Sequence, residues 1–238
     1  RNERLYGRGA ADMKASLAAM VVAVEEFTSK YPNNKGKIAF LLTSDEEGVA
    51  TDGTIRIVEH IKNRTDLTID YCVVGEPRSK DSLGDTIRIG RRGSLNAVLR
   101  VKGIEGHVAY PTEAKNPIHH ALPALDELAR YEWDAGNEYY PPTSMQISNV
   151  RAGAGTENVI PGALECQFNF RFSTEHTAES LKEVTQHIFD KYSLDYEISW
   201  RLSGNPFLTA EGKLTENVKA AIRDRLSVET ELSTGGGT

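Results

Sequence analysis

Residues 163–172 alternate between apolar and polar side chains with a period of two. A β-strand sends successive side chains to opposite faces of its sheet, so this segment predicts a strand with one buried face and one open face. A helix has a period of 3.6 residues and does not fit this pattern. The apolar positions are Leu164, Cys166, Phe168, Phe170 and Phe172, and the polar positions are Glu165, Gln167, Asn169 and Arg171.

The segments around this strand follow an order that indicates a ferredoxin-like unit. Strand and helix patterns follow one another as strand, helix, strand, strand, helix and strand. They are expected at 93–102, after Pro117, at 143–151, at 163–172, at about 178–191 and at 195–202. We therefore predict an inserted α+β domain of βαββαβ connectivity over residues 92–205. Its sheet edges and its open face need a partner or solvent to cover them.

The segments on either side of this unit show a different sequence pattern, in which short continuous apolar runs alternate with predicted helices. Such runs are typical of parallel strands covered on both faces. Helices are expected at 13–30 and 51–62, strands at 37–44 and 69–75, and a further helix through Leu214, Val218, Ile222 and Leu226. The fold class is therefore an α/β catalytic-type domain over residues 1–91, which the inserted domain interrupts and which resumes over residues 206–238.

Carboxylates stand where the predicted parallel strands stop. Glu46 and Glu47 follow the first run, Glu76 follows the second, and Asp12 lies in a glycine-rich turn before the first helix. Ligand sites of open α/β sheets lie beyond the carboxyl ends of their strands. Taken singly, these residues could be a helix cap and solvated loop residues. Taken together, they favour a divalent metal site, in which one of two adjacent glutamates binds metal and the other moves a proton.

Composition narrows the classes of partner. The chain has 238 residues, and acidic residues exceed basic ones by 34 to 28, giving a net charge of −6. With no basic tract and no apolar stretch of membrane-span length, nucleic acid and membrane are not expected partners. Cys72 and Cys166 lie in apolar runs and are expected to be buried, reduced thiols, which fits a cytoplasmic protein. The ends are expected to be those of a piece cut from a longer protein, or else of a small intact domain with a glycine-rich tail.

Other candidate residues have an ordinary reading and a functional one. His107 lies in a loop bounded by glycines and a proline, which is compatible with a surface histidine or with a shaped functional loop. Arg91 and Ser94 could form a charged hinge or an anion clamp, and Arg171 a salt bridge or a carboxylate clamp. The backbone amides before Thr238 could bind an anion, or the glycine-rich segment could be only a flexible end.

In order along the chain, these motifs resemble the zinc aminoacylase and carboxypeptidase family of co-catalytic metallohydrolases. The strings that carry the resemblance are GRGAADMK at 7–14, TSDEEG at 43–48, VGEP at 74–77, GRRGS at 90–94, GHVAYP at 106–111, PPTS at 141–144, NVIPG at 158–162, NFRFST at 169–174 and SGNPFLT at 203–209. Together they run through nearly the whole chain. The later strings resemble family members that remove a succinyl group from a diamino dicarboxylic acid.

The resemblance implies a metal site and a homodimer. Asp12 would bridge two zinc ions, for which cobalt or manganese could substitute, with Glu76 and Glu47 completing the two sites and Glu46 acting as general base and acid. The inserted domain would pair with its copy in a second subunit. His107 would then reach the partner's active site, where it holds the carbonyl oxygen.

The resemblance also implies a set of contacts to a small dicarboxylate substrate. Those residues would be Arg91, Ser94, Asn158, Arg171, Gly237 and Thr238, with Asn158 acting across the subunit interface. The expected reaction is metal-dependent hydrolysis of an N-succinyl diamino acid, as in diaminopimelate and lysine biosynthesis.

The chain departs from the family pattern at its metal ligands. The family takes one histidine per metal from outside this range, so metal occupancy of these 238 residues alone is expected to be reduced. Gly235 also stands where close relatives carry threonine. The alternatives are a sibling deacylase such as acetylornithine deacetylase, a dipeptidase, or a non-catalytic fragment that serves only as a dimerisation module.

Overall fold

A computed structural model describes residues 3–44, 46–48, 50–64 and 67–236 of the chain. It has a mixed α/β fold and divides into two compact units, Arg1–Arg78 and Ser79–Thr238. Among the described residues, no helix combines the length and the apolar character that crossing a bilayer would require.

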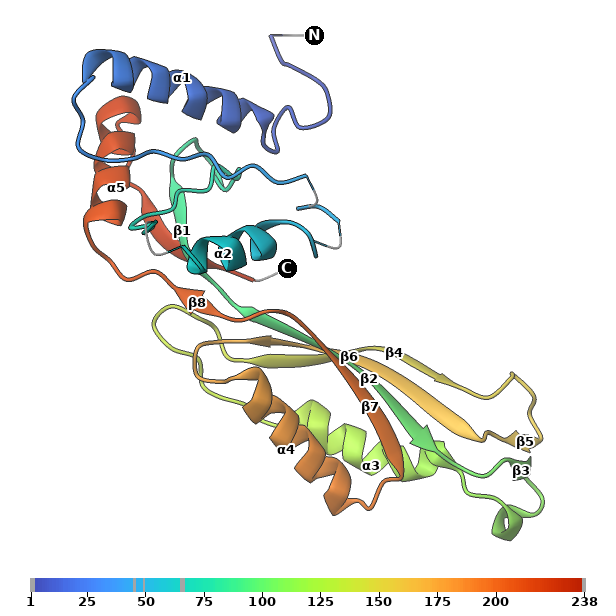
Figure 1. The fold of residues 1–238 in the computed structure, drawn as a ribbon. Coiled ribbons are helices and arrows are strands. Elements are labelled where there is room, and N and C mark those ends of the chain that lie inside the picture. The colour runs from blue at the N-terminus through green and yellow to red at the C-terminus, as the bar shows by residue number, and fades with distance from the viewer. Residues whose placement is uncertain (1–2, 45, 49, 65–66, 237–238) are drawn as a thin grey trace. The chain divides into compact units, whose positions relative to one another are not determined.

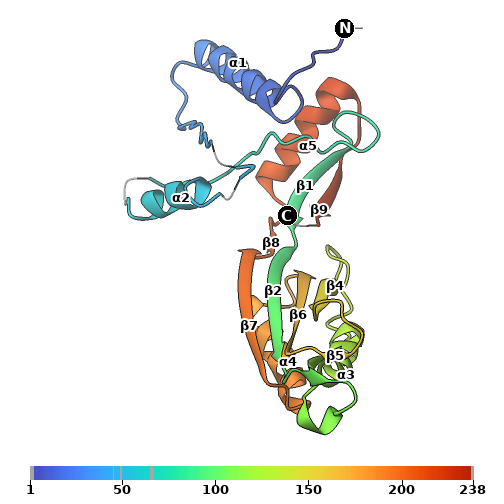
Figure 2. The ribbon, with the colours of Figure 1, turned by 90° about the vertical axis from the view of Figure 1, so that its right-hand side faces the viewer.

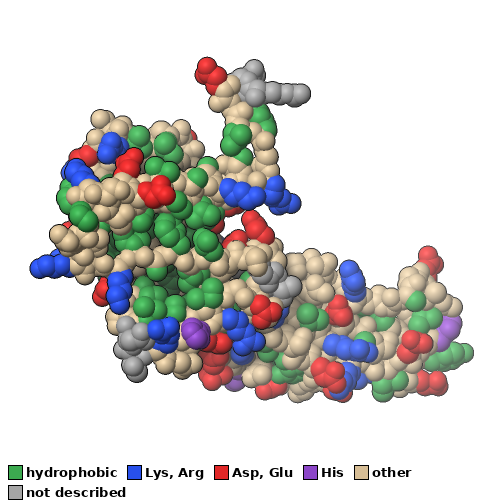
Figure 3. Space-filling model, turned by 45° about the horizontal axis from the view of Figure 1, so that its top comes forward, with side chains coloured by type: hydrophobic (Ala, Val, Ile, Leu, Met, Phe, Trp, Pro, Cys, Tyr) green, Lys and Arg blue, Asp and Glu red, His purple; other side chains and the backbone are tan. Residues whose placement is uncertain are grey.

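In the described part of the first unit, the helices are α1 (Lys14–Lys30) and α2 (Thr54–Lys62). Both helices were predicted, but the strands expected at 37–44 and 69–75 are wrong, because neither segment forms a strand in the structure. A parallel strand needs a hydrogen-bonded neighbour and apolar cover on both faces, and the described residues of this unit supply neither. Most apolar side chains of the two segments are consequently exposed, and hydrophobic side chains are abundant on the surface (Figure 3). Cys72, expected to be buried, is exposed for the same reason.

The second unit contains the predicted βαββαβ element. Its members are β2 (Gly93–Lys102), α3 (Pro117–Arg130), β4 (Ser144–Ala152), β6 (Ala163–Phe172), α4 (Ala178–Lys191) and β7 (Tyr196–Gly204). The strands form one antiparallel sheet in the order β4-β6-β2-β7, which confirms the ferredoxin-like connectivity. The helices begin at caps that the sequence supplies. Asn116 accepts a hydrogen bond from the Ile118 amide, and Thr177 forms a capping box with Ser180.

The core of this element lies between one sheet face and helices α3 and α4 (Figure 1). All five apolar residues of β6 are buried, as the alternation predicts. The Trp133 ring meets the Phe170 ring edge to face at 4.7 Å between centroids, and Phe168 meets Trp200 in the same way at 5.8 Å. The polar residues of β6 therefore occupy the opposite, open face of the sheet.

A second, three-stranded sheet adjoins this element. Its order is β8-β1-β9, formed by β8 (Phe207–Leu208), β1 (Thr86–Arg91) and β9 (Glu231–Gly235), with α5 (Lys213–Leu226) between β8 and β9 in the chain. These strands were not predicted from the sequence. The parallel pairing of β9 with β1 brings residues after 206 back beside those before 92. The boundaries at 91/92 and 205/206 stay a prediction. The two compact units divide at a different place, between Arg78 and Ser79.

The two sheets of the second unit meet at a tightly packed junction. The Tyr140 hydroxyl donates a hydrogen bond to the Phe207 carbonyl, and Thr234 Oγ1 donates to the Tyr139 carbonyl at 2.5 Å. Gly90 lies under this contact, where a Cβ atom would collide with the Tyr140 hydroxyl and lie 2.6 Å from the Phe207 carbonyl oxygen. Only glycine fits there, so Arg91 and the start of β2 are held at a defined position.

Candidate active site

Three of the predicted carboxylates gather in the first unit. Glu76 is half-buried and shares a hydrogen bond with Asp12. Partial burial raises the pKa of Glu76, and the hydrogen bond to Asp12 and the negative charges of Asp12 and Glu46 raise it further, while Arg78 opposes the shift. Residues from three separate segments therefore form one group of repelling carboxylates.

Local packing explains how two of them meet. Asp12 lies one residue before Met13, the N-cap of α1, and Glu76 follows Gly75. A Cβ atom on Gly75 would lie 2.7 Å from Met20 Cε and 2.9 Å from Ser16 Cβ, so the backbone at Gly75 rests directly on the first turns of α1. That close approach sets Glu76 beside the residue that leads into the helix.

The carboxylates fit a divalent cation in donor type, but they are not a complete metal site. Carboxylate oxygens suit zinc, manganese or magnesium. Within the described ranges, no three histidine, cysteine, aspartate or glutamate side chains are placed to hold a metal ion together. The structure places Glu46 near Glu76, and Glu47 is exposed in the same turn. The assignment of Glu47 as ligand and Glu46 as base stays a prediction.

Cationic and hydroxyl groups gather at the start of β2. Ser94 is buried and lies directly opposite Arg171 in the pairing of β2 with β6. The Arg91 guanidinium stands 5.9 Å from the centre of the Phe207 ring. Burial lowers the pKa of Arg92, and the positive charge of Arg171 lowers it further, so two guanidinium groups are near each other. The arrangement suits an anionic ligand. Gly237 and Thr238 lie outside the described residues.

His107 and Asn158 are brought together at the other end of β2. Strands β3 (Gly106–His107) and β5 (Val159–Ile160) form a two-stranded ladder in which His107 pairs with Val159. The Val108 amide donates to the Asn158 carbonyl at 3.1 Å. The two residues were predicted separately from distant motifs, and the structure places them, both exposed, on two neighbouring loops.

The local contacts of His107 select its tautomer. Its Nδ1 atom accepts a hydrogen bond of 3.1 Å from the Ala109 amide. In a neutral imidazole one nitrogen accepts and the other carries the proton, so Nε2 carries it here. The Tyr110 ring lies 5.8 Å from the imidazole, centroid to centroid. The side chain is thus a hydrogen-bond donor at Nε2.

The cationic residues at the start of β2 and the loops that carry His107 and Asn158 are separated by the length of a strand. Ser94 and Lys102 mark the two ends of β2, and a strand rises about 3.3 Å per residue, so they are about 25 Å apart. Figures 1 and 2 show β3 and β5 at the end of the four-stranded sheet that is remote from β1 and β8. Within one chain, His107 therefore does not reach the cationic group around Ser94 and Arg171.

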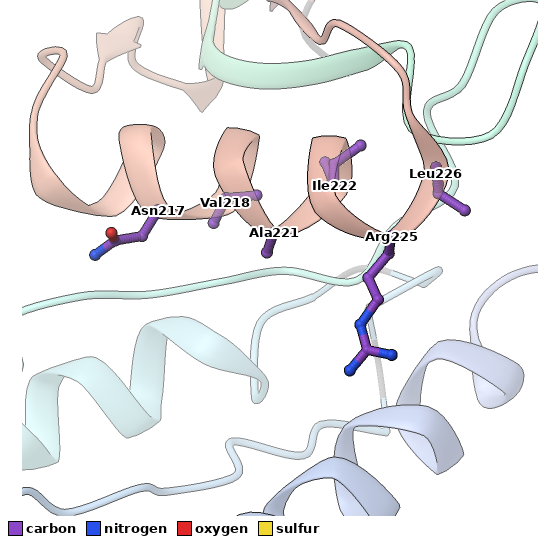
Figure 4. Close-up of a pocket in the computed structure, with 6 residues that line it drawn as sticks. All are labelled: Asn217, Val218, Ala221, Ile222, Arg225 and Leu226. Carbon is purple, nitrogen blue, oxygen red and sulfur yellow. The ribbon is translucent and has the colours of Figure 1, made fainter.

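The hollow drawn in Figure 4 lies on α5 and holds none of the predicted site residues. Its lining is mostly apolar, and the side chains of Asn217, Ala221 and Arg225 project from one side of the helix. The lining residues are Asn217, Val218, Ala221, Ile222, Arg225 and Leu226. It offers no group for acid–base or nucleophilic chemistry.

The model of the family described as peptidase family M20/M25/M40 matches residues 1–238. Relatives named succinyl-diaminopimelate desuccinylase are 58% identical in Aromatoleum aromaticum, 59% in Thioalkalivibrio sulfidiphilus and 60% in Acinetobacter baumannii, each over all 238 residues. The chain spans 62% of the length of the first and 63% of the other two.

Solved structures resemble the fold at low sequence identity. An M20-family metallo-carboxypeptidase from Sulfolobus solfataricus has a TM-score of 0.57 at 13% identity, covering 68% of this chain and 57% of its own. Aminopeptidase PepT from Bacillus cereus has a TM-score of 0.53 at 14% identity, covering 67% and 42%. At these identities the likeness shows the fold alone.

The carboxylate group makes a testable contribution to stability. A carboxyl whose pKa is raised by folding binds its proton more tightly in the folded state. Its contribution to stability is therefore present below the unfolded pKa, near 4.5, and is lost as pH rises through the folded pKa. In the full-length protein stripped of metal with chelator, Glu76→Gln should raise the thermal unfolding midpoint at pH 7 and flatten its dependence on pH above 4.5.

The control for this measurement is Glu25→Gln, which removes a carboxylate from an exposed position of α1. That change should leave the pH dependence as in the parent protein. Equal pH dependence in the parent and in Glu76→Gln would contradict the description of the group.

Proposed function

Because the chain belongs to peptidase family M20/M25/M40, we propose that the full-length protein is a succinyl-diaminopimelate desuccinylase. It would hydrolyse N-succinyl-LL-2,6-diaminopimelate to succinate and LL-2,6-diaminopimelate. The names of relatives that are 58–60% identical over the whole chain support this reaction. The pairing of Ser94 with Arg171 beside Arg91 supports a substrate that carries several carboxylates.

The carboxylates of the first unit would contribute to a centre of two zinc ions per subunit. Asp12 would bridge the ions, and Glu47 and Glu76 would each bind one. Histidines, the usual further ligands of zinc in hydrolases, are not among the residues gathered here. When bound, the ions supply Lewis-acid activation of the scissile carbonyl and of the attacking water.

Glu46 would carry the proton through the reaction. It takes a proton from water as the oxygen attacks the carbonyl carbon, and it gives that proton to the amine nitrogen as the carbon–nitrogen bond breaks. Its position near Glu76 and Asp12 keeps it beside the groups proposed to bind metal. No proton is gained or lost by the chain over one turnover.

His107 would act on the active site of a partner subunit in a homodimer. The single observation that supports this is the length of β2. Ser94 and Lys102 are about 25 Å apart along it, and the loop that carries His107 follows Lys102. The donor at Nε2 suits a role in stabilising the carbonyl oxygen as it gains negative charge. Asn158 lies on the neighbouring loop and would accompany it.

A substrate panel tests the proposed reaction. The purified full-length protein, loaded with zinc, should hydrolyse N-succinyl-LL-2,6-diaminopimelate in preference to N-acetylornithine and to a dipeptide. Release of free amine from each substrate is the measurement. A preference for N-acetylornithine or the dipeptide would assign the protein to a sibling activity. A folded, metal-loaded protein that hydrolyses none of the three would contradict the enzymatic proposal.

The adjacent glutamates should separate into two roles. Glu46→Ala should lower the turnover number by about 10²–10⁴-fold while the bound metal stays near the parent level, because a general base is removed and no ligand is lost. Glu47→Ala should lose metal. Metal content by mass spectrometry and turnover are measured on the same samples. If Glu46→Ala loses the metal and Glu47→Ala keeps it, the roles are reversed.

Subunit mixing tests whether His107 acts in a partner. Glu46→Ala and His107→Ala should each be nearly inactive, because His107→Ala removes a donor worth roughly 10²–10³-fold in rate. A heterodimer of the two variants has one active site with an intact Glu46 and an intact partner His107, so activity should return on exchange.

The control replaces His107→Ala with the double variant Glu46→Ala/His107→Ala, which cannot rebuild a complete site. Tagged subunits verify that exchange has occurred. Absence of recovery after verified exchange would show that His107 does not act across the interface.

A further inference from the structure

Asn169 lies at the centre of a hydrogen-bonded group on the open face of the four-stranded sheet. Its Oδ1 atom accepts from Arg171 Nε at 2.9 Å. Its Nδ2 atom donates toward Asn96 Oδ1 at 3.0 Å, Ser94 Oγ at 3.2 Å and the Leu95 carbonyl at 3.3 Å. One half-buried amide thus joins two of the residues proposed to bind substrate, Ser94 and Arg171.

The surroundings of the amide fix which way it points. Arg171 Nε can only donate, and the Leu95 carbonyl can only accept. If the Asn169 amide were flipped, its nitrogen would face the first and its oxygen would face the second, and both hydrogen bonds would be lost. The hydrogen bonds to Arg171 Nε and to the Leu95 carbonyl therefore set the orientation of the Asn169 amide.

Asn96 anchors this group to the neighbouring strand. Its Nδ2 atom donates to Ser203 Oγ at 3.0 Å and to the Arg201 carbonyl at 3.3 Å, both on β7. Asn96 also lies directly opposite Asn169 in the pairing of β2 with β6. The chain of amides therefore runs from β7 through β2 to β6, three strands that are adjacent in the sheet (Figure 1).

A neutral amide beside Arg171 can orient the guanidinium without adding a negative charge. A carboxylate at the same place would also hold Nε, but it would pair with the guanidinium and cancel much of its positive charge. The amide oxygen holds Nε of the guanidinium and itself adds no charge to the group. An anionic ligand would therefore meet an oriented cation.

From this geometry we propose that Asn169 is a positioning residue that orients Arg171 and Ser94 for a substrate carboxylate. The proposal rests on the proposed function of those two residues. Asn169 itself does not touch the substrate. Its effect is exerted through the orientation of Arg171, whose Nε it holds.

The test uses the isosteric variant Asn169→Asp in the full-length, zinc-loaded protein. The added carboxylate should pair with Arg171 and raise KM for N-succinyl-LL-2,6-diaminopimelate by about tenfold, with a smaller change in kcat. Arg171→Gln should raise KM as well. In the double variant, Asn169→Asp should add little to the effect of Arg171→Gln, because its action passes through that side chain.

The matched control is Asn149→Asp, which places the same charge on β4 of the same sheet. The Asn149 side chain contacts Ser148 and Gln167, four residues from Arg171 along β6. It should leave KM near the parent value. Thermal unfolding of each variant shows whether it is folded. If Asn169→Asp is folded and leaves KM unchanged while Arg171→Gln raises it, the positioning role is wrong. The same conclusion follows if Asn169→Asp raises KM equally with and without Arg171.

A second readout needs no substrate and separates this inference from the proposed function. In ¹⁵N-labelled protein, the Nε–H signal of Arg171 is assigned by its loss in Arg171→Lys. Asn169→Ala should shift this signal and speed its exchange with water, and Asn149→Ala should do neither. If the parent protein hydrolyses no succinylated substrate, the proposed function fails and this signal decides the inference. An unchanged signal in Asn169→Ala would overturn it.

Discussion

The pairing of β2 on both of its long edges is the constraint from which the rest of the arrangement follows. β2 forms ladders with β6 on one side and β7 on the other. A shift of one residue would turn its apolar set toward the open face and its polar set into the core, so its register is strongly held. Ser94 is thereby fixed at one end and the loop that carries His107 at the other. The two therefore lie about 25 Å apart along one strand.

The carboxylates of the first unit present the complementary problem of charge. Asp12, Glu46 and Glu76 come from three segments, and their mutual repulsion and the burial of Glu76 raise the pKa of that residue. Such a group costs free energy at neutral pH unless it binds a proton or a cation. The cationic group around Arg171 is stabilised instead by a bound anion. The first group suits a divalent cation and the second suits an anionic ligand.

The sequence predicted the elements whose formation depends on residues close to one another in the chain. The alternation of β6, the caps of α3 and α4 and the order of the βαββαβ element all follow from residues near one another in the sequence. The strands expected at 37–44 and 69–75 are wrong because an apolar run forms a strand only when a neighbour pairs with it. The short strands β1, β8 and β9 were missed because their pairing joins residues far apart in sequence.

In the candidate site, too, the residue types could be predicted from the sequence, whereas the long-range contacts could not. The residue types and their motifs were available from the sequence, and so was the resemblance that linked them. The contacts of Asn169 were not, since an asparagine on an open sheet face carries no local signal of its four partners.

The claim of a shared site is tested most directly by an isotope-coded cross-link. A photoreactive residue replaces Val108, which is exposed beside His107. Dimers are formed from a mixture of ¹⁴N and ¹⁵N subunits and irradiated, and peptides linked to the segment with Glu46 and Glu47 are analysed by mass spectrometry. A site shared between subunits predicts linked pairs with one light and one heavy peptide. Pairs that are always uniformly light or uniformly heavy would contradict it.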